Sequence, residues 1–245
     1  PALRQGVPAL GVDVADSPTG DQAAIAKWQG ACCTEVEAFH VKTDAEEVAE
    51  RVYAIATDSE NPVSPRHIGL DSVGIGASAY NALVRKGMRV RKISSASRAI
   101  PQLDTDARWS ATSEDYDGQT KPSGPVAVES ELYDSQRSQV MWRMREDLRM
   151  GRVALPQDEQ LWRDLCTPTY TTRAGRIVVE SKEHIMLRLK RSPDKGDACC
   201  YGNFVRQRTP IRGRAAEANV KRSHNRDTGL ERFMAAHAKR EKAEE

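Results

Sequence analysis

The sequence predicts an α/β fold, a mixed β-sheet flanked by helices, and three observations support it. Three apolar, strand-like runs follow one another near the amino terminus and are separated by short polar turns. Helical periods then alternate with further strand-like runs. The 245 residues, of which 39% are hydrophobic and 29% charged, can bury an adequate core and contain no apolar run of the roughly 18 to 20 residues that crosses a bilayer.

The amino-terminal strands are predicted from apolar runs and their turns. Residues 9–13 form an apolar run that leads directly into Asp13. A Ser-Pro-Thr-Gly turn at 17–20 separates this run from a second at 23–28, and residues 31–40 continue the β character. Three consecutive antiparallel strands are therefore expected, with a carboxylate at the end of the first.

A strand, a helix and a strand are predicted in the middle of the chain. After a helix at 44–57 capped by Thr43, the run at 67–71 again ends in an aspartate, Asp71. A helix at 77–86, closed by a glycine, and a strand at 88–93 follow. This order predicts a parallel crossover.

The second half of the chain begins with a long segment, residues 94–131, that has no sustained period and is predicted to be a loop. The elements expected after it are helices at 135–150 and 159–165, a hairpin at 169–180 that turns at Ala174-Gly175, a helix at 182–190, and a helix that begins at Pro193 and ends near Tyr201.

Charge and cysteine content set further expectations. The net charge is +2, but residues 205–245 hold 11 Lys and Arg against 6 Asp and Glu. We therefore predict a folded domain over residues 1–204 and a basic, flexible tail over 205–245, which either attracts phosphate or is a solvated tail without a partner. The five cysteines have no Cys-x-x-Cys spacing and are predicted to be reduced, mostly buried, small apolar fillers.

Four aspartates are candidates for one metal site: Asp13, Asp71, Asp194 and Asp197. Each follows a predicted strand or begins a predicted helix, where side chains distant in sequence can meet. Carboxylates that share a site raise one another's pKa and favour a bound cation. Oxygen ligands favour Mg²⁺ or Mn²⁺, and two such ions can support phosphodiester cleavage. Taken singly, each aspartate is equally typical of a turn or a helix cap.

Four blocks, in this order, carry a resemblance to a known family: GVDVA at 11–15, GLDSVGIG at 69–76, GRIVVESK at 175–182 and SPDKGDA at 192–198. They resemble the nuclease domain of the large terminase subunit of tailed double-stranded DNA bacteriophages, a member of the RNase H-like superfamily. Residues 137–142 and 148–156 are also similar to that family, and the resemblance extends over about residues 8–204.

The resemblance implies an RNase H-like fold with a β-hairpin near the active site. It also implies a metal-dependent endonuclease that cuts concatemeric double-stranded DNA with low sequence specificity, using two divalent ions, Mg²⁺ or Mn²⁺. Asp13 is then expected to bridge both ions, Asp71 to bind one, Asp197 to complete the site, and Asp194 to add a ligand or position water.

Positive side chains near the hairpin and the last helix are predicted to bind the DNA backbone, with a solvated charged face as the alternative. They are Arg173, Arg176, Lys182 and Lys195.

The family's full-length motor implies further partners: an amino-terminal ATPase domain, a portal protein and a small terminase subunit, in the host cell cytoplasm during phage assembly, and no membrane. The present sequence has no glycine-rich loop ending in Gly-Lys-Ser or Gly-Lys-Thr. We therefore expect this chain to cut DNA without hydrolysing ATP.

Two other interpretations remain open at the level of sequence. A junction resolvase or a transposase of the same fold also uses acidic residues and metal, but requires recognition of a DNA structure or sequence. A non-catalytic docking module is the other alternative, in which the basic tail binds a portal ring or a small terminase subunit and the aspartates are structural.

Overall fold

The computed structural model describes residues 2–15, 20–100 and 132–207. Its centre is a five-stranded mixed sheet in the order β3-β2-β1-β4-β5. Strands β1, β2 and β3 pair antiparallel and β5 pairs parallel with β4, as the sequence predicts, and β4 also pairs parallel with β1. The strands are β1 (Pro8–Asp13), β2 (Ala23–Gln29), β3 (Cys32–Phe39), β4 (Ile68–Asp71) and β5 (Arg91–Ile93).

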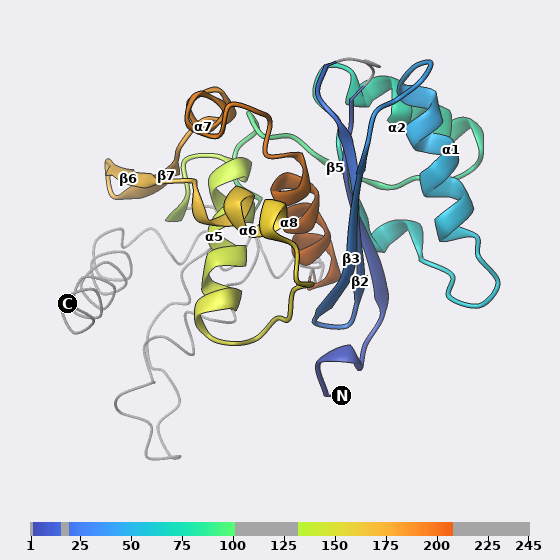
Figure 1. Ribbon diagram of the computed structural model, residues 1–245, viewed down its shortest axis with the longest axis horizontal. Coiled ribbons are helices and arrows are strands. Elements are labelled where there is room, and N and C mark those ends of the chain that lie inside the picture. The colour runs from blue at the N-terminus through green and yellow to red at the C-terminus, as the bar shows by residue number, and fades with distance from the viewer. Residues whose placement is uncertain (1, 16–19, 101–131, 208–245) are drawn as a thin grey trace, which may run out of the picture.

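Helices cover both faces of the sheet (Figure 1). On one face, α1 (Ala45–Ala56) and α2 (Gly76–Arg85) pack on apolar side chains of β1 and β4. On the other face, α5 (Gln136–Arg149), α6 (Glu159–Cys166) and α8 (Asp194–Arg206) enclose a second core. Two short 3₁₀ helices, η1 (Ala2–Arg4) and η2 (Pro65–His67), precede β1 and β4. No helix among the described residues is both long and apolar enough to span a membrane.

Helix α8 lies directly on strand β1 because glycines remove the side chains between them. A Cβ atom added to Gly11 would lie 1.9 Å from the carbonyl oxygen of Ala198 and 2.2 Å from the nitrogen of Gly202. Side chains alternate along a strand, so Asp13 points to the same face as Gly11. The first turn of α8 is thereby held beside the end of β1.

The predicted hairpin is present as β6 (Tyr170–Arg173) and β7 (Arg176–Val179). Its two turn residues, Ala174 and Gly175, have φ angles of 49° and 74°, the left-handed values that a two-residue hairpin turn requires. The buried Ile177 attaches the hairpin to the body of the protein through a small core that includes Trp142. Strand β7 then leads into α7 (Lys182–Leu189).

Three local predictions are wrong. The cap of α1 is Asp44, not Thr43, since the Asp44 side chain accepts a hydrogen bond from the Glu46 nitrogen. Strand β5 has three residues instead of six. Helix α8 does not end near Tyr201 but continues to Arg206, because its last turns remain buried in the core. Residues 101–131 of the predicted loop and residues 208–245 of the predicted tail lie outside the described residues.

Candidate active site

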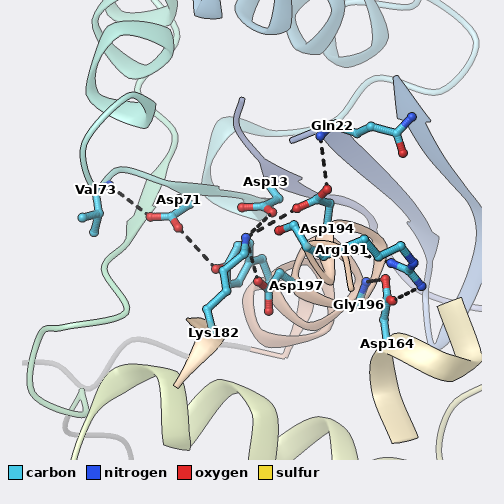
Figure 2. A network of polar contacts seen from close by, with 12 residues as sticks. Asp13, Gln22, Asp71, Val73, Asp164, Lys182, Arg191, Asp194, Gly196 and Asp197 are labelled. Carbon is cyan, nitrogen blue, oxygen red and sulfur yellow. Dashed lines mark hydrogen bonds and ion pairs between the residues drawn. The ribbon is translucent and has the colours of Figure 1, made fainter. Parts of the chain in front are cut away.

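The four candidate aspartates lie together at the carboxyl ends of strands β1 and β4, beside the start of α8 (Figure 2). Asp13 ends β1 and Asp71 ends β4, two neighbouring parallel strands, while Asp194 and Asp197 occupy the first turn of α8. Asp13, Asp194 and Asp197 are 4%, 6% and 0% exposed. Carboxylates so deeply buried require compensating partners.

Lys182 supplies most of that compensation. Its ammonium lies 2.9 Å from Asp13 Oδ2, 3.1 Å from Asp197 Oδ2 and 3.5 Å from Asp194 Oδ1. The contact with Asp13 has hydrogen-bond geometry, whereas Asp197 Oδ2 is in ion-pair contact and accepts no hydrogen bond from any residue that the structure describes. Lys182 is the first residue of α7, so the hairpin delivers this cation to the aspartates.

Burial and mutual repulsion control protonation in this cluster. Burial raises the pKa of Asp13 well above its usual range; Lys182 opposes this effect, and the charges of Asp197 and Asp194 add to it. For Lys182, burial alone favours the neutral amine, but the charges of Asp13 and Asp197 outweigh it and raise its pKa above its ordinary value. The carboxyl of Asp13 is therefore easier to protonate than a free aspartate, while the ammonium of Lys182 stays charged beside it.

Asp71 stands slightly apart and is held by different groups. The backbone nitrogen of Val73 donates to Asp71 Oδ1 at 3.0 Å, and the Tyr201 hydroxyl donates to Oδ2 at 3.4 Å. Partial burial raises the pKa of Asp71, and these two hydrogen bonds oppose the rise. Asp71 is more exposed than the other three aspartates, which leaves it open to a ligand from solvent.

Two residues that were not assigned a role from the sequence support the site. Arg137 of α5 donates from Nε to the Glu180 carbonyl at 3.2 Å and places Nη1 3.5 Å from Asp197 Oδ1. Its side chain is 10% exposed, and the carboxylate of Asp197 raises its pKa against the effect of burial. Tyr201 follows Asp197 by four residues, a spacing that puts both on one helix face and could have indicated its role.

A second polar network anchors the first turn of α8. Asp164 of α6 accepts a hydrogen bond from the Gly196 nitrogen at 3.1 Å and forms an ion pair with Arg191 at 2.5 Å. The backbone nitrogen of Gln22 donates to Asp194 Oδ2 at 3.2 Å. These contacts fix Asp194 and Asp197 before any ligand binds.

The four predicted DNA-binding side chains lie in different settings. Arg173 is 77% exposed and reaches Asp134 at 3.1 Å, and Arg176 is exposed at the hairpin turn. Lys195 forms an ion pair with Asp158 at 2.6 Å, and Lys182 lies among the aspartates. Contact of these residues with DNA remains a prediction.

The chemistry of the donors fits a hard divalent cation. In residues 2–15, 20–100 and 132–207, no three His, Cys, Asp or Glu side chains form a preassembled metal cluster. Three carboxylates nevertheless surround one ammonium within 3.5 Å, so Lys182 stands in for a cation. Oxygen-only donors of this kind are those that Mg²⁺ and Mn²⁺ prefer. Metal binding at Asp13 and Asp197 then requires the Lys182 ammonium to move.

Solved structures with the same arrangement of elements were found by comparison. The nuclease domain of the large terminase subunit gp2 of bacterial virus Sf6 has a TM-score of 0.60 at 15% identity, covering 84% of this chain and 90% of that one. A mutant of that domain with manganese and beta-thujaplicinol has a TM-score of 0.62 at 14% identity, covering 85% and 90%. This chain has the fold of a terminase nuclease domain.

The terminase nuclease fold is RNase H-like and accounts for the mixed sheet, the flanking helices and the hairpin. A further mutant of the Sf6 domain, with manganese, has a TM-score of 0.59 at 13% identity, covering 81% of this chain and 88% of that chain. No protein-family model matches the chain, and no curated protein sequence matches it. The likeness is thus one of fold.

Proposed function

We propose that this chain is a metal-dependent DNA endonuclease, the nuclease part of a terminase that packages a viral genome. The observation that carries the proposal is the convergence of Asp13, Asp194 and Asp197 on one ammonium within 3.5 Å, with Asp71 beside them. The terminase nuclease fold and the manganese in a similar structure support it. The substrate is proposed to be concatemeric double-stranded DNA, cut with low sequence specificity.

Asp13, Asp71, Asp194 and Asp197 are the residues that would hold two divalent ions. When bound, such ions activate a water and stabilise the leaving oxygen of a phosphodiester. The chain's own contribution is preorganisation: Asp13 and Asp197 are held in place by burial, and Asp71 by Val73 and Tyr201. Arg137 remains as a fixed positive charge beside Asp197 when Lys182 moves away.

The wider assembly is also part of the proposal. The partners would be double-stranded DNA and, in the complete motor, an ATPase domain, a portal protein and a small terminase subunit in the host cytoplasm. Residues 1–204 are proposed to be the nuclease domain and residues 205–245 a basic tail. The absence of a phosphate-binding loop in the sequence predicts that the chain itself does not hydrolyse ATP.

The test is cleavage of supercoiled plasmid with EDTA, Mg²⁺ or Mn²⁺, comparing the wild type with Asp71→Asn. We expect nicking and linearisation that require metal and are lost in the variant. Asp58→Asn is the control, because Asp58 is an exposed aspartate whose carboxylate accepts a local hydrogen bond from the Glu60 nitrogen. No cleavage by folded wild-type protein under any metal refutes the proposal and favours the docking module. A strong preference for branched over linear DNA favours a resolvase.

The two aspartates of α8 are expected to differ in importance. Asp197 is fully buried and contacts both Lys182 and Arg137, whereas Asp194 also bonds the Gln22 backbone. We expect Asp197→Ala to abolish cleavage and Asp194→Ala to slow it. The reverse order in the same plasmid assay would contradict this assignment.

A further inference from the structure

A separate group of basic residues lies on the edge strand of the sheet, β5, and on the residues around it. Residues 85–100 contain six Lys and Arg and no Asp or Glu. Two of the six are paired with α1, since Arg85 contacts Glu46 at 2.5 Å and Lys86 contacts Glu50 at 2.8 Å. In the part of the chain that the structure describes, none of the others forms an ion pair with a carboxylate; they are Arg89, Arg91, Lys92 and Arg98.

The 3₁₀ helix before β4 adds two more basic residues to this edge. Arg91 Nε donates to the carbonyl oxygen of Arg66 at 2.5 Å, which holds the Arg91 guanidinium against η2. Burial, with the nearby charge of Arg66, lowers the pKa of Arg91; burial and both arginines lower that of His67. Like charges held this close repel one another, and a bound anion would relieve the repulsion.

The pairing of β4 with β5 shows how far these basic residues lie from the aspartates along the strands. In the parallel pairing of β4 and β5, Ile93 lies opposite Asp71 and Arg91 lies opposite Gly69. A strand advances about 3.3 Å per residue, so the Arg91 backbone lies roughly 7 Å along the strand from the level of Asp71. Lys92 extends to the other face, with its ammonium 4.0 Å from the Tyr80 ring centre. Arg91 therefore lies two residues before the level of Asp71, and Arg66 and Arg89, which precede β4 and β5, lie farther toward the other end of these strands.

We propose that Arg66, Arg89, Arg91 and Lys92 form a phosphate-binding edge over which the DNA backbone passes on its way to the aspartates. This inference rests on the proposed function and adds a substrate contact to it. A duplex presents closely spaced phosphates along each strand, so several separate cations along this edge can each meet one. The edge lies apart from the hairpin, so it is a contact distinct from Arg173 and Arg176.

The test compares two double variants that remove equal charge from neighbouring positions. Arg89→Gln with Lys92→Gln removes two exposed cations that have no carboxylate partner among the described residues. Arg85→Gln with Lys86→Gln removes two that are already paired with α1. The affinity of each protein for a 30-base-pair duplex, labelled for fluorescence anisotropy, is measured in Ca²⁺ over a series of salt concentrations, with plasmid cleavage and the melting temperature measured in parallel.

We expect the edge variant to bind DNA more weakly and to lose up to about 1.8 from the slope of log affinity against log salt, roughly 0.9 for each phosphate contact removed. The paired-residue variant should keep the wild-type slope. Equal slopes in the two variants overturn the proposal. An edge variant that aggregates but keeps its DNA affinity overturns it as well, because the charges on β5 would then serve to prevent pairing with the strands of other molecules. If the wild type neither binds nor cleaves DNA, the proposed function fails as well; cleavage with equal slopes refutes the edge alone.

Discussion

The ammonium of Lys182 lies where a cation is expected, which makes its removal the most informative perturbation. Lys182→Met keeps much of the side-chain volume and removes the charge. A metal ion that binds Asp13 and Asp197 must displace this ammonium from contacts of 2.9 Å and 3.1 Å. A hydrogen bond between charged groups is worth roughly 1.5 to 3 kcal/mol, and the Lys182 side chain is 29% exposed, which moderates the value.

Competition of about 1.5 to 3 kcal/mol corresponds to roughly 10- to 140-fold in the dissociation constant, since 1.4 kcal/mol is a factor of ten. Lys182→Met is therefore expected to bind Mn²⁺ that much more tightly, as measured by isothermal titration calorimetry. In EDTA the variant should be less stable by on the order of 3 kcal/mol, because three carboxylates lose their cation. Added Mn²⁺ should then raise its melting temperature more than that of the wild type.

The control is Lys195→Met, which breaks a 2.6 Å ion pair with the more exposed Asp158 and keeps the contacts of Lys182 with the aspartates. It should lose a little stability and keep the wild-type affinity for Mn²⁺. Weaker or unchanged Mn²⁺ binding by Lys182→Met would refute the reasoning, since it would mean that the ammonium does not occupy the metal position.

Two more predictions concern the framework of the site. Gly11→Ala should destabilise the protein by about 1 to 3 kcal/mol and reduce cleavage, because the new Cβ would lie 1.9 Å from the Ala198 carbonyl oxygen and push α8 away from β1. Chemical denaturation measures the stability and the plasmid assay measures the cleavage. A variant with wild-type stability and cleavage would contradict this packing. Arg188 lowers the pKa of Glu180 from its ordinary 4.5 to about 2, so the stabilisation is full above pH 4.5 and is lost as the pH falls toward 2. Urea titrations from pH 6 to pH 3 should show the difference between wild type and Glu180→Gln shrinking, and a constant difference would be inconsistent with the Glu180–Arg188 pair as its source.

The sheet and the aspartates at its edge could be predicted from the sequence because both are encoded locally. Each of the strands β1 and β4 is an apolar run that ends in an aspartate before a turn, and the parallel crossover follows from the order of elements. Turn chemistry likewise located the hairpin at Ala174-Gly175. The cap of α1 was misplaced by one residue because Thr43 and Asp44 are both good cap formers.

The parts that could not be predicted depend on tertiary packing. Gly202 and Asn203 are typical of helix ends, so α8 was expected to stop near Tyr201. Gly202 instead lies inside the helix because Trp28 and Gly11 pack against it, within 3.0 Å of where its Cβ would be. The ion pairs of Lys182 with three aspartates could not be inferred either, since its local pattern is the same as that of a surface lysine.

Helix α8 is the last element of the chain that the structure describes, yet it supplies Asp194 and Asp197 and covers the face of β1 that carries Asp13. During synthesis the strands leave the ribosome long before this helix does, and chains grow at about 5 to 20 residues per second. A nascent chain can therefore form its sheet while the aspartate cluster is still incomplete. On the proposed function, cutting activity would then require that α8 has been made, and a chain that stops before Asp194 would be inactive and would leave an apolar surface uncovered.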